Sequence, residues 1–278
     1  MQKSDIEKIE IELLLESIYQ RFGYDFRHYA KASISRRIYN LLKKSGYSEI
    51  SELIPRLLHD ASFIEKILHH FSIPVTEMFR DPNFFCRLRE IIIPYLKKQP
   101  FIKIWHAGCA TGEEVYSLAI LLQEENIYQR STIFATDFNE DALKIAQKGI
   151  YSLEHIKKFT QNYQQAGGSQ SFSDYYHARY GAVIIHQTLK DQITFAHHNL
   201  VTDSMFSEMH LILCRNVLIY FDKILQERVF KLFKDSLFAE GFLCLGNKES
   251  LLFSEAINHF QIIDEQQKIY QKKLINEI

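Results

Sequence analysis

The segment Ile102–Gln123, IKIWHAGCATGEEVYSLAILLQ, constrains the fold of this chain more than any other stretch. A run typical of a buried strand, Ile102 to Ala107, ends at the turn Gly108–Gly112, and a helical pattern of leucines follows at once. A strand, a glycine turn and a helix in this order place backbone N–H groups and a helix N-terminus against a bound ligand. The sequence therefore predicts a ligand site at the end of this strand.

The turn differs from the glycine pattern that binds dinucleotides. Gly108 and Gly112 are followed directly by Glu113 and Glu114, and the pattern G-x-G-x-x-G is absent. Two carboxylates at a helix N-terminus would repel a pyrophosphate, but they suit a ligand that carries an ammonium or sulfonium group. S-adenosylmethionine has both groups and a ribose, so it fits this turn better than NAD does. In the simpler alternative the two glutamates only complement the helix dipole.

A second acidic signal follows at the end of the next predicted strand. The apolar run Thr132–Thr136 ends in Asp137. An acidic residue at the tip of the second strand commonly holds the ribose hydroxyls of a nucleotide-like cofactor. Asp137 therefore favours a ligand-binding role for the two glutamates over a role in the helix dipole alone.

Composition excludes several classes of protein. The length of 278 residues suggests one large domain or two smaller ones, and the net charge of −1 gives no general attraction to nucleic acid or to an anionic membrane. We expect no membrane insertion, because no apolar run is long enough and the N-terminus lacks a signal-peptide core. The four cysteines form no C-x-x-C pair, which indicates reduced thiols in a cytosolic protein. The histidine pairs His69-His70 and His197-His198 point apart, so we expect no metal site.

Residues 1–72 have the pattern of an all-helical domain. An apolar stripe of Ile9, Leu13, Leu14 and Ile18 predicts a first helix that ends at Gly23. A second predicted helix, at about 33–44, is basic without acidic interruption and includes Arg36 and Arg37. Such a face is most simply a solvated surface, and an acidic partner surface is the competing interpretation.

Residues 73–95 are expected to link the helical domain to the following domain. Pro74 and Pro82 bracket a short segment that contains Thr76 and Arg80, and a helix is expected from Pro82 to Leu96. An arginine in this position is either a surface charge or a clamp over the cofactor.

Residues 96–278 alternate between strand and helix patterns. Further strands are expected at Ile193–His197, Met209–Cys214 and Gly241–Leu245, and an antiparallel pair is expected in the region Ile262–Leu274. Residues 151–190 interrupt the alternation and predict an inserted small β-rich subdomain. The pattern indicates an α/β fold with a mostly parallel, doubly wound sheet. The polar groups that follow its strands should share the edge formed by the carboxyl ends.

The chain resembles the CheR family of chemotaxis-receptor methyltransferases over nearly its whole length. The matching segments are Val75-Thr-Glu-Met-Phe-Arg80, Ala110-Thr-Gly-Glu-Glu114 with Tyr116-Ser117, Ala135-Thr-Asp137, Asn199-Leu200 and Cys214-Arg-Asn-Val-Leu-Ile-Tyr-Phe221. The last of these is the most specific. The resemblance implies an all-α N-terminal domain, a linker, and a Rossmann-like methyltransferase domain with an inserted small antiparallel β-subdomain.

The resemblance also implies a reaction and a partner. S-adenosylmethionine would be the methyl donor and S-adenosylhomocysteine the product. Glutamate side chains on the cytoplasmic signalling helices of methyl-accepting chemotaxis receptors would be the acceptors, and the enzyme would be cytoplasmic and recruited to receptor arrays. In some relatives the inserted subdomain binds the C-terminal tail peptide of a receptor, and the compact insertion here leaves that contact open.

The resemblance assigns cofactor contacts residue by residue. Glu114 would hold the methionyl ammonium, Asp137 the ribose hydroxyls, and Asn199 and Leu200 would flank the adenosyl part. Some relatives have Asn where this chain has Pro74, so one side-chain contact to the cofactor is absent here. The expected cofactor-binding set is Thr76, Arg80, Ala107, Gly108, Glu114, Asp137, Asn199, Leu200, Arg215 and Asn216.

The catalytic and substrate-binding assignments have the same origin. Arg80, Arg215 and Tyr220 would lie near the transferring methyl group, and Arg36 and Arg37 would face the receptor. A glutamate carboxylate is already ionised near neutral pH, so its methylation needs no general base. Two other function classes remain open: a methyltransferase that acts on a small molecule or RNA, and a non-catalytic module that binds S-adenosylmethionine in signalling. The near-zero net charge argues against RNA.

Overall fold

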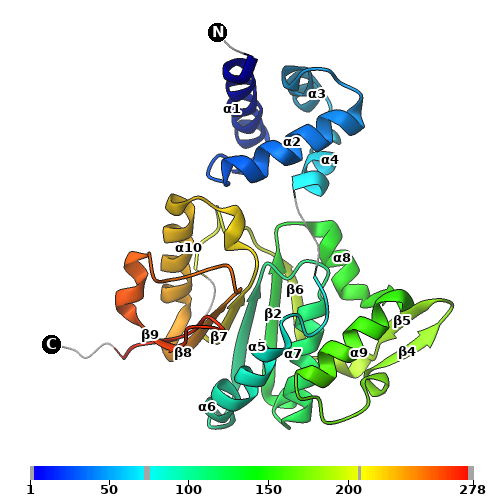
Figure 1. The fold of residues 1–278 in the computed structure, drawn as a ribbon, viewed down its shortest axis with the longest axis vertical. Coiled ribbons are helices and arrows are strands. Elements are labelled where there is room, and N and C mark those ends of the chain that lie inside the picture. Colours follow the sequence, from blue (N-terminus) through cyan, green and yellow to red (C-terminus); the bar gives the residue numbers. More distant parts are fainter. Residues whose placement is uncertain (1–2, 72–75, 206–207, 275–278) are drawn as a thin grey trace. The chain divides into compact units, whose positions relative to one another are not determined.

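The computed structural model describes residues 3–71, 76–205 and 208–274 (Figure 1). Pro74 and Val75 of the predicted linker lie outside the described residues. The chain divides into two compact units. One comprises Met1–Ile73 with Val201–Asp203 and Leu218–Val229, and the other comprises Pro74–Leu200, Ser204–Val217 and Phe230–Ile278.

The first unit is helical, as the sequence predicted. Its buried residues include Leu14, Ile18, Ile38, Leu57 and Phe71. Its helices are α1 (Lys3–Phe22), α2 (Lys31–Ser45), the 3₁₀ turn η1 (Ile50–Glu52), α3 (Leu53–His59) and α4 (Phe63–Phe71).

The apolar stripe predicted on α1 is partly wrong. Leu14 and Ile18 are buried, but Ile9 and Leu13 are 45% and 53% exposed. The buried face instead follows a spacing of four residues, which brings Glu10 inward with Leu14 and Ile18. Glu10 Oε1 accepts a hydrogen bond from the Ser51 amide at 3.2 Å.

A segment far along the chain completes the helical unit, which the sequence did not predict. The Ala30 amide donates to the Tyr220 carbonyl and the Asp222 amide to the His28 carbonyl, both at 2.8 Å. Asp222 then caps α10 (Lys223–Ser236) by accepting from the Leu225 amide at 2.9 Å.

The second unit is built on a seven-stranded sheet in the order β6-β2-β1-β7-β8-β10-β9 (Figure 1). Strands β6, β2, β1, β7 and β8 are parallel, and β10 pairs antiparallel with both β8 and β9. The doubly wound, mostly parallel sheet is confirmed. The strands are β1 (Ile102–Ala107), β2 (Ser131–Asp137), β6 (Ile193–His197), β7 (Met209–Cys214), β8 (Leu237–Leu245), β9 (Phe260–Asp264) and β10 (Ile269–Lys272).

The helices of this unit cover an apolar core that includes Trp105, Leu118 and Phe233. They are α5 (Pro82–Arg87), which continues through the π-helical turn η2 (Leu88–Ile92) into α6 (Ile93–Lys97), then α7 (Glu113–Glu124), α8 (Glu140–Lys148) and the end of α10. No helix in the described part of the chain combines the length and hydrophobicity needed to cross a membrane.

The insertion forms a small antiparallel sheet beside α9, seen in green in Figure 1. Strands β3 (Ile150–Ser152), β5 (Ala182–Ile185) and β4 (Tyr176–Arg179) lie in that order. The predicted β-subdomain is confirmed, but the helix α9 (Ile156–Gln165) was not expected. Its polar composition concealed the buried face made by Phe159, Asn162 and Tyr163, which have helical spacing.

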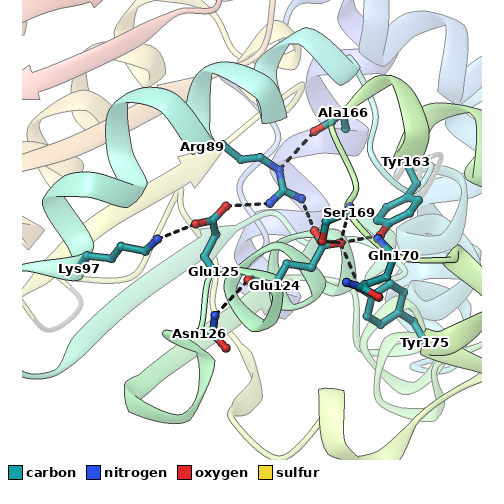
Figure 2. A network of polar contacts seen from close by, with 10 residues as sticks. All are labelled: Arg89, Lys97, Glu124, Glu125, Asn126, Tyr163, Ala166, Ser169, Gln170 and Tyr175. Atoms are coloured by element: carbon teal, nitrogen blue, oxygen red, sulfur yellow. Dashed lines mark hydrogen bonds and ion pairs between the residues drawn. The ribbon is translucent and has the colours of Figure 1, made fainter.

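Glu124, at the end of α7, joins this insertion to the core (Figure 2). Its Oε1 accepts from the Tyr163 hydroxyl at 2.5 Å, the Ser169 amide at 2.9 Å and the Tyr175 hydroxyl at 3.1 Å, and its other oxygen pairs with Arg89. Burial alone would raise the pKa of Glu124, but the Tyr163 and Ser169 hydrogen bonds and Arg89 together bring it below its ordinary value.

Replacing Glu124 by Gln should lower the free energy of unfolding on the order of 3 kcal/mol at neutral pH, because the nearly buried Glu124 side chain loses its ion pair with Arg89 and one of its acceptor oxygens. The pKa of Glu124 is lowered in the folded state, so its contribution is complete above the ordinary value of 4.5 and is lost as the pH falls through the folded value. Urea unfolding of both proteins should therefore show a difference that narrows below about pH 4.5.

Glu125→Gln is the matched control. Glu125 pairs with Arg89 and Lys97 but its side chain is 23% exposed, so its loss should cost about 1 kcal/mol or less. Equal losses for the two variants would show that Glu124 does not anchor the insertion.

Candidate active site

The strand order reverses at β1, which has β2 on one side and β7 on the other. In open α/β sheets, ligands bind outside the carboxyl ends of the strands at such a reversal. The residues that follow β1 and β7 at this edge are the turn Gly108–Gly112 and Arg215. The sequence prediction of a ligand site therefore falls at the position that the topology favours.

The glycine turn after β1 is closely packed. Gly108 and Gly112 have φ angles of 76° and 91°, which favour glycine. A Cβ at Gly108 would lie 2.5 Å from Val217, and a Cβ at Gly112 would lie 2.8 Å from the Ala146 Cβ. The turn is held to β2 because the amides of Gly108 and Cys109 donate to the Thr136 carbonyl.

Asp137 at the end of β2 holds the same turn. Its Oδ2 accepts from the Ala110 amide and its Oδ1 from the Asn139 amide, both at 2.9 Å. Burial raises the pKa of Asp137, and these N–H groups offset only part of the effect. A carboxylate has about four acceptor positions, so ribose hydroxyls can still bind to it.

Glu114 is paired within the protein, which the sequence did not predict. Its Oε2 lies 2.6 Å from Arg215 Nη1 and its Oε1 lies 3.2 Å from His106 Nε2. The other terminal nitrogen of Arg215 lies 2.7 Å from Asp81, and the Arg215 side chain is fully buried. Burial would raise the pKa of Glu114, but Arg215 and His106 outweigh it and lower the pKa, so Glu114 is ionised.

Glu113 differs from its neighbour. Its Oε2 accepts from the Thr111 hydroxyl at 2.6 Å, and burial raises the pKa of Glu113 to about 7. With Glu114 and Asp137, three buried carboxylates therefore surround one turn. Desolvated carboxylates favour a ligand that brings positive charge and hydroxyl donors, and S-adenosylmethionine has both. The residues present fit this cofactor.

The structure brings Arg80 to the same edge. Its carbonyl accepts from Arg215 Nη1 at 3.3 Å, and its guanidinium is close enough to contribute to the lowered pKa of Glu114. Its neighbours Phe79 and Asp81 have φ angles of 51° and 56°, which are strained for residues other than glycine. Thr76, earlier in the same segment, is partly exposed.

Other predicted cofactor residues also follow strands of the sheet. Ala107 is buried at the end of β1, and Asn199 and Leu200 follow β6 with exposures of 9% and 7%. Asn216 has a φ angle of 62°, and its amide donates to Glu249 Oε2 at 3.0 Å.

Tyr220 and the two predicted substrate arginines belong to the helical unit. Arg36 is exposed, but Arg37 is only 4% exposed and its guanidinium carbon lies 4.5 Å from the centre of the Tyr220 ring. The sequence predicted that Arg36 and Arg37 both lie on the surface of α2. This prediction is wrong for Arg37, which is buried against the aromatic ring of Tyr220. Arg36 alone of the two is exposed on α2.

Sequence reasoning missed His106, Asp81 and Glu249. Glu249 Oε2 also accepts from the Gly246 amide at 2.6 Å, so it holds the end of β8 against Asn216. The rule that polar residues after parallel strands gather at one edge could have found Glu249. A histidine inside an apolar strand was the available signal for His106.

Comparisons with known proteins agree with this geometry. The family model described as CheR methyltransferase, SAM binding domain, matches residues 74–269, and the CheR methyltransferase all-alpha domain matches residues 9–72. A Pseudomonas putida protein named "Putative methyltransferase Cher3" is 48% identical over 264 residues, which cover 95% of this chain and 97% of that protein.

More distant relatives are named chemotaxis protein methyltransferase. That of Listeria innocua is 29% identical and that of Salmonella typhimurium 26% identical. The matches cover 83% and 94% of this chain, and 86% and 90% of the relatives. The chain therefore belongs to the CheR methyltransferase family and is an S-adenosylmethionine-dependent methyltransferase.

Proposed function

We propose that this protein methylates glutamate side chains on the cytoplasmic signalling helices of chemotaxis receptors. The observation that carries the proposal is that the Arg80 side chain has no bonding partner among the described residues. Its guanidinium makes no hydrogen bond or ion pair with any described residue, whereas both terminal nitrogens of Arg215 beside it are in ion pairs. A partly exposed arginine at the edge of the cofactor site is suited to bind a carboxylate in two-pronged geometry.

The chemistry requires orientation rather than proton transfer. When bound, S-adenosylmethionine supplies a methyl group made electrophilic by the sulfonium. A carboxylate oxygen would form the new C–O bond as the S–CH₃ bond breaks, and the bonding pair would stay on sulfur. Both charges are neutralised without movement of a proton. Arg80 would hold the carboxylate in line with that bond, at a separation of about 3 Å.

The remaining site residues take supporting roles in this proposal. Asp137 would accept the ribose hydroxyls, and Glu113 and Glu114 would face the methionyl ammonium. Arg215 has both terminal nitrogens engaged, so it would fix Glu114 and the Arg80 segment instead of contacting the acceptor.

Two relatives are named chemotaxis protein methyltransferase, which supports a role in chemotaxis. We propose that the partner is a receptor and that the contact takes place in the cytoplasm. Exposed Arg36 on α2 is the surface charge that we assign to receptor contact, and Lys31, Lys43 and Lys44 on the same helix are also exposed. A tail peptide of a receptor would be a separate ligand of the β-subdomain.

Incubation with labelled S-adenosylmethionine and receptor cytoplasmic fragments tests the proposal. The expected product is a base-labile methyl ester, and fragments with Gln in place of the acceptor glutamates should remain unlabelled. Label that is stable to base, or transfer to RNA or a small molecule in place of the fragments, would contradict it.

Arg36→Glu should reduce this methylation and leave cofactor affinity unchanged, and the loss should shrink as salt screens the contact. Lys8→Glu is a matched control because Lys8 is an exposed cation on α1 of the same unit. Equal methylation rates for the two variants would show that the basic face of α2 is only a solvated surface and does not contact the receptor.

Asp137→Ala should weaken S-adenosylmethionine and S-adenosylhomocysteine alike. Loss of charge-assisted bonds to two hydroxyls should cost on the order of 1.5–3 kcal/mol of binding free energy in calorimetry. Cys244→Ala, buried in β8, controls for general loosening of the sheet. Unchanged affinity for both ligands would remove Asp137 from the site.

Arg80→Ala should lower turnover about a hundredfold at saturating S-adenosylmethionine. Lysine should rescue poorly, since a point charge cannot supply the two-pronged geometry. Turnover is to be measured against cofactor concentration for wild type, Ala and Lys. Full recovery at saturation would mean that Arg80 only binds the cofactor.

A further inference from the structure

We infer that the inserted subdomain is part of the catalytic apparatus, and that Asn162 on its helix α9 is a positioning residue for Arg80. The inference rests on the proposed role of Arg80 as the group that orients the acceptor carboxylate. This role of the insertion, which is to position Arg80, is separate from the binding of a receptor tail peptide to its small sheet.

The main chain around Arg80 is held at successive residues. Asn162 Nδ2 donates to the Met78 carbonyl at 3.0 Å, and the Phe79 amide donates to Ser117 Oγ at 2.8 Å. Arg215 then donates to the Arg80 carbonyl and pairs with the Asp81 carboxylate. Three different elements, α9, α7 and the loop after β7, therefore fix four consecutive residues.

The contact from α9 is well buried. Asn162 is 1% exposed and Met78 is fully buried, so a carbonyl without this donor would lie away from water. A buried carbonyl without a partner is unfavourable, which favours a backbone shift that restores its solvation. The next residue that such a shift would move is Phe79, and Arg80 follows it.

Aromatic packing from the insertion acts at the same place. The Phe79 ring lies 5.2 Å from Tyr163 and 6.4 Å from Phe172, both in edge-to-face geometry. These three rings are buried. The insertion thus holds Phe79 by its ring and Met78 by its carbonyl.

This support offsets local strain. Phe79 and Asp81, on either side of Arg80, both have positive φ angles, which residues other than glycine adopt with strain. The segment keeps this shape only while its neighbours impose it. Without the α9 contact it should relax, and the Arg80 side chain would lose its fixed direction.

Hydrogen exchange measured by mass spectrometry over residues 76–84 of the full chain tests the placement without reference to catalysis. In Asn162→Ala the amide hydrogens of residues 76–84 should exchange several-fold faster than in wild type. Asn162→Leu, whose side chain has nearly the same shape but no donor, should show the same increase. Exchange unchanged in both variants would overturn the inference.

Phe159→Leu is the matched control on the same helix. It removes a buried ring from α9 and retains both the Asn162 donor and the Tyr163 ring that packs on Phe79. Exchange over 76–84 and turnover should stay near wild-type values in this variant. A turnover loss equal to that of Asn162→Ala would make the effect one of general stability and would overturn the inference.

A double-mutant cycle links the placement to the reaction. Asn162→Ala should lower turnover at saturating cofactor about tenfold or more with little change in cofactor affinity. In an Arg80→Ala background it should have no further effect, because the residue it positions is gone. Effects that multiply would overturn the positioning role. Absence of methyl ester formation by wild type would instead refute the proposed function, and the exchange result would still decide the role of Asn162.

Discussion

The site depends on the ion pairs made by the guanidinium of Arg215, whose side chain is fully buried. One terminal nitrogen lies 2.6 Å from Glu114 at the start of α7, and the other lies 2.7 Å from Asp81 beside Arg80. The aromatic ring of Phe84 lies 4.0 Å from its central carbon. Removing one partner of a buried ion pair costs about 3–5 kcal/mol, because the remaining charge has no water to solvate it. Arg215 therefore fixes the helix after the glycine turn and the Arg80 segment together.

This pairing divides the two adjacent glutamates into different states. Glu114 is ionised against Arg215 and His106, whereas burial raises the pKa of Glu113 to about 7. Glu113 therefore ionises with difficulty in the folded protein. As the pH rises from the ordinary value of 4.5 toward 7, Glu113 ionises more readily in the unfolded chain, so the free energy of unfolding falls. A ligand that brings positive charge to this turn would relieve that cost. Electrostatics alone thus favours a cationic cofactor at this edge.

The insertion is bound to the core at both ends of α7. At the start, the Tyr151 hydroxyl of β3 donates to the Thr111 carbonyl in the glycine turn at 2.8 Å. At the end, Glu124 gathers donors from Tyr163, Ser169 and Tyr175, as Figure 2 shows. In addition, Asn162 of α9 donates a hydrogen bond to the Met78 carbonyl, in the segment that contains Arg80. The insertion therefore contacts the glycine turn directly through Tyr151.

The sequence by itself determined the α/β fold, the glycine turn, the acidic end of β2 and the helical N-terminal unit. Each of these depends on local pattern: the period of apolar residues, the position of glycine, and the rule that parallel strands end at one edge. The tertiary structure decided which charges are paired and which are free. Glu114 and Arg215 are far apart in the sequence and each looked available for a ligand, yet they bind each other, while Arg80 has no ion pair among the described residues. It also buried Arg37 against Tyr220 and turned Asn162, one of many polar residues in the insertion, toward Met78. Such pairings depend on distances between segments remote in the chain, and no local pattern encodes those distances.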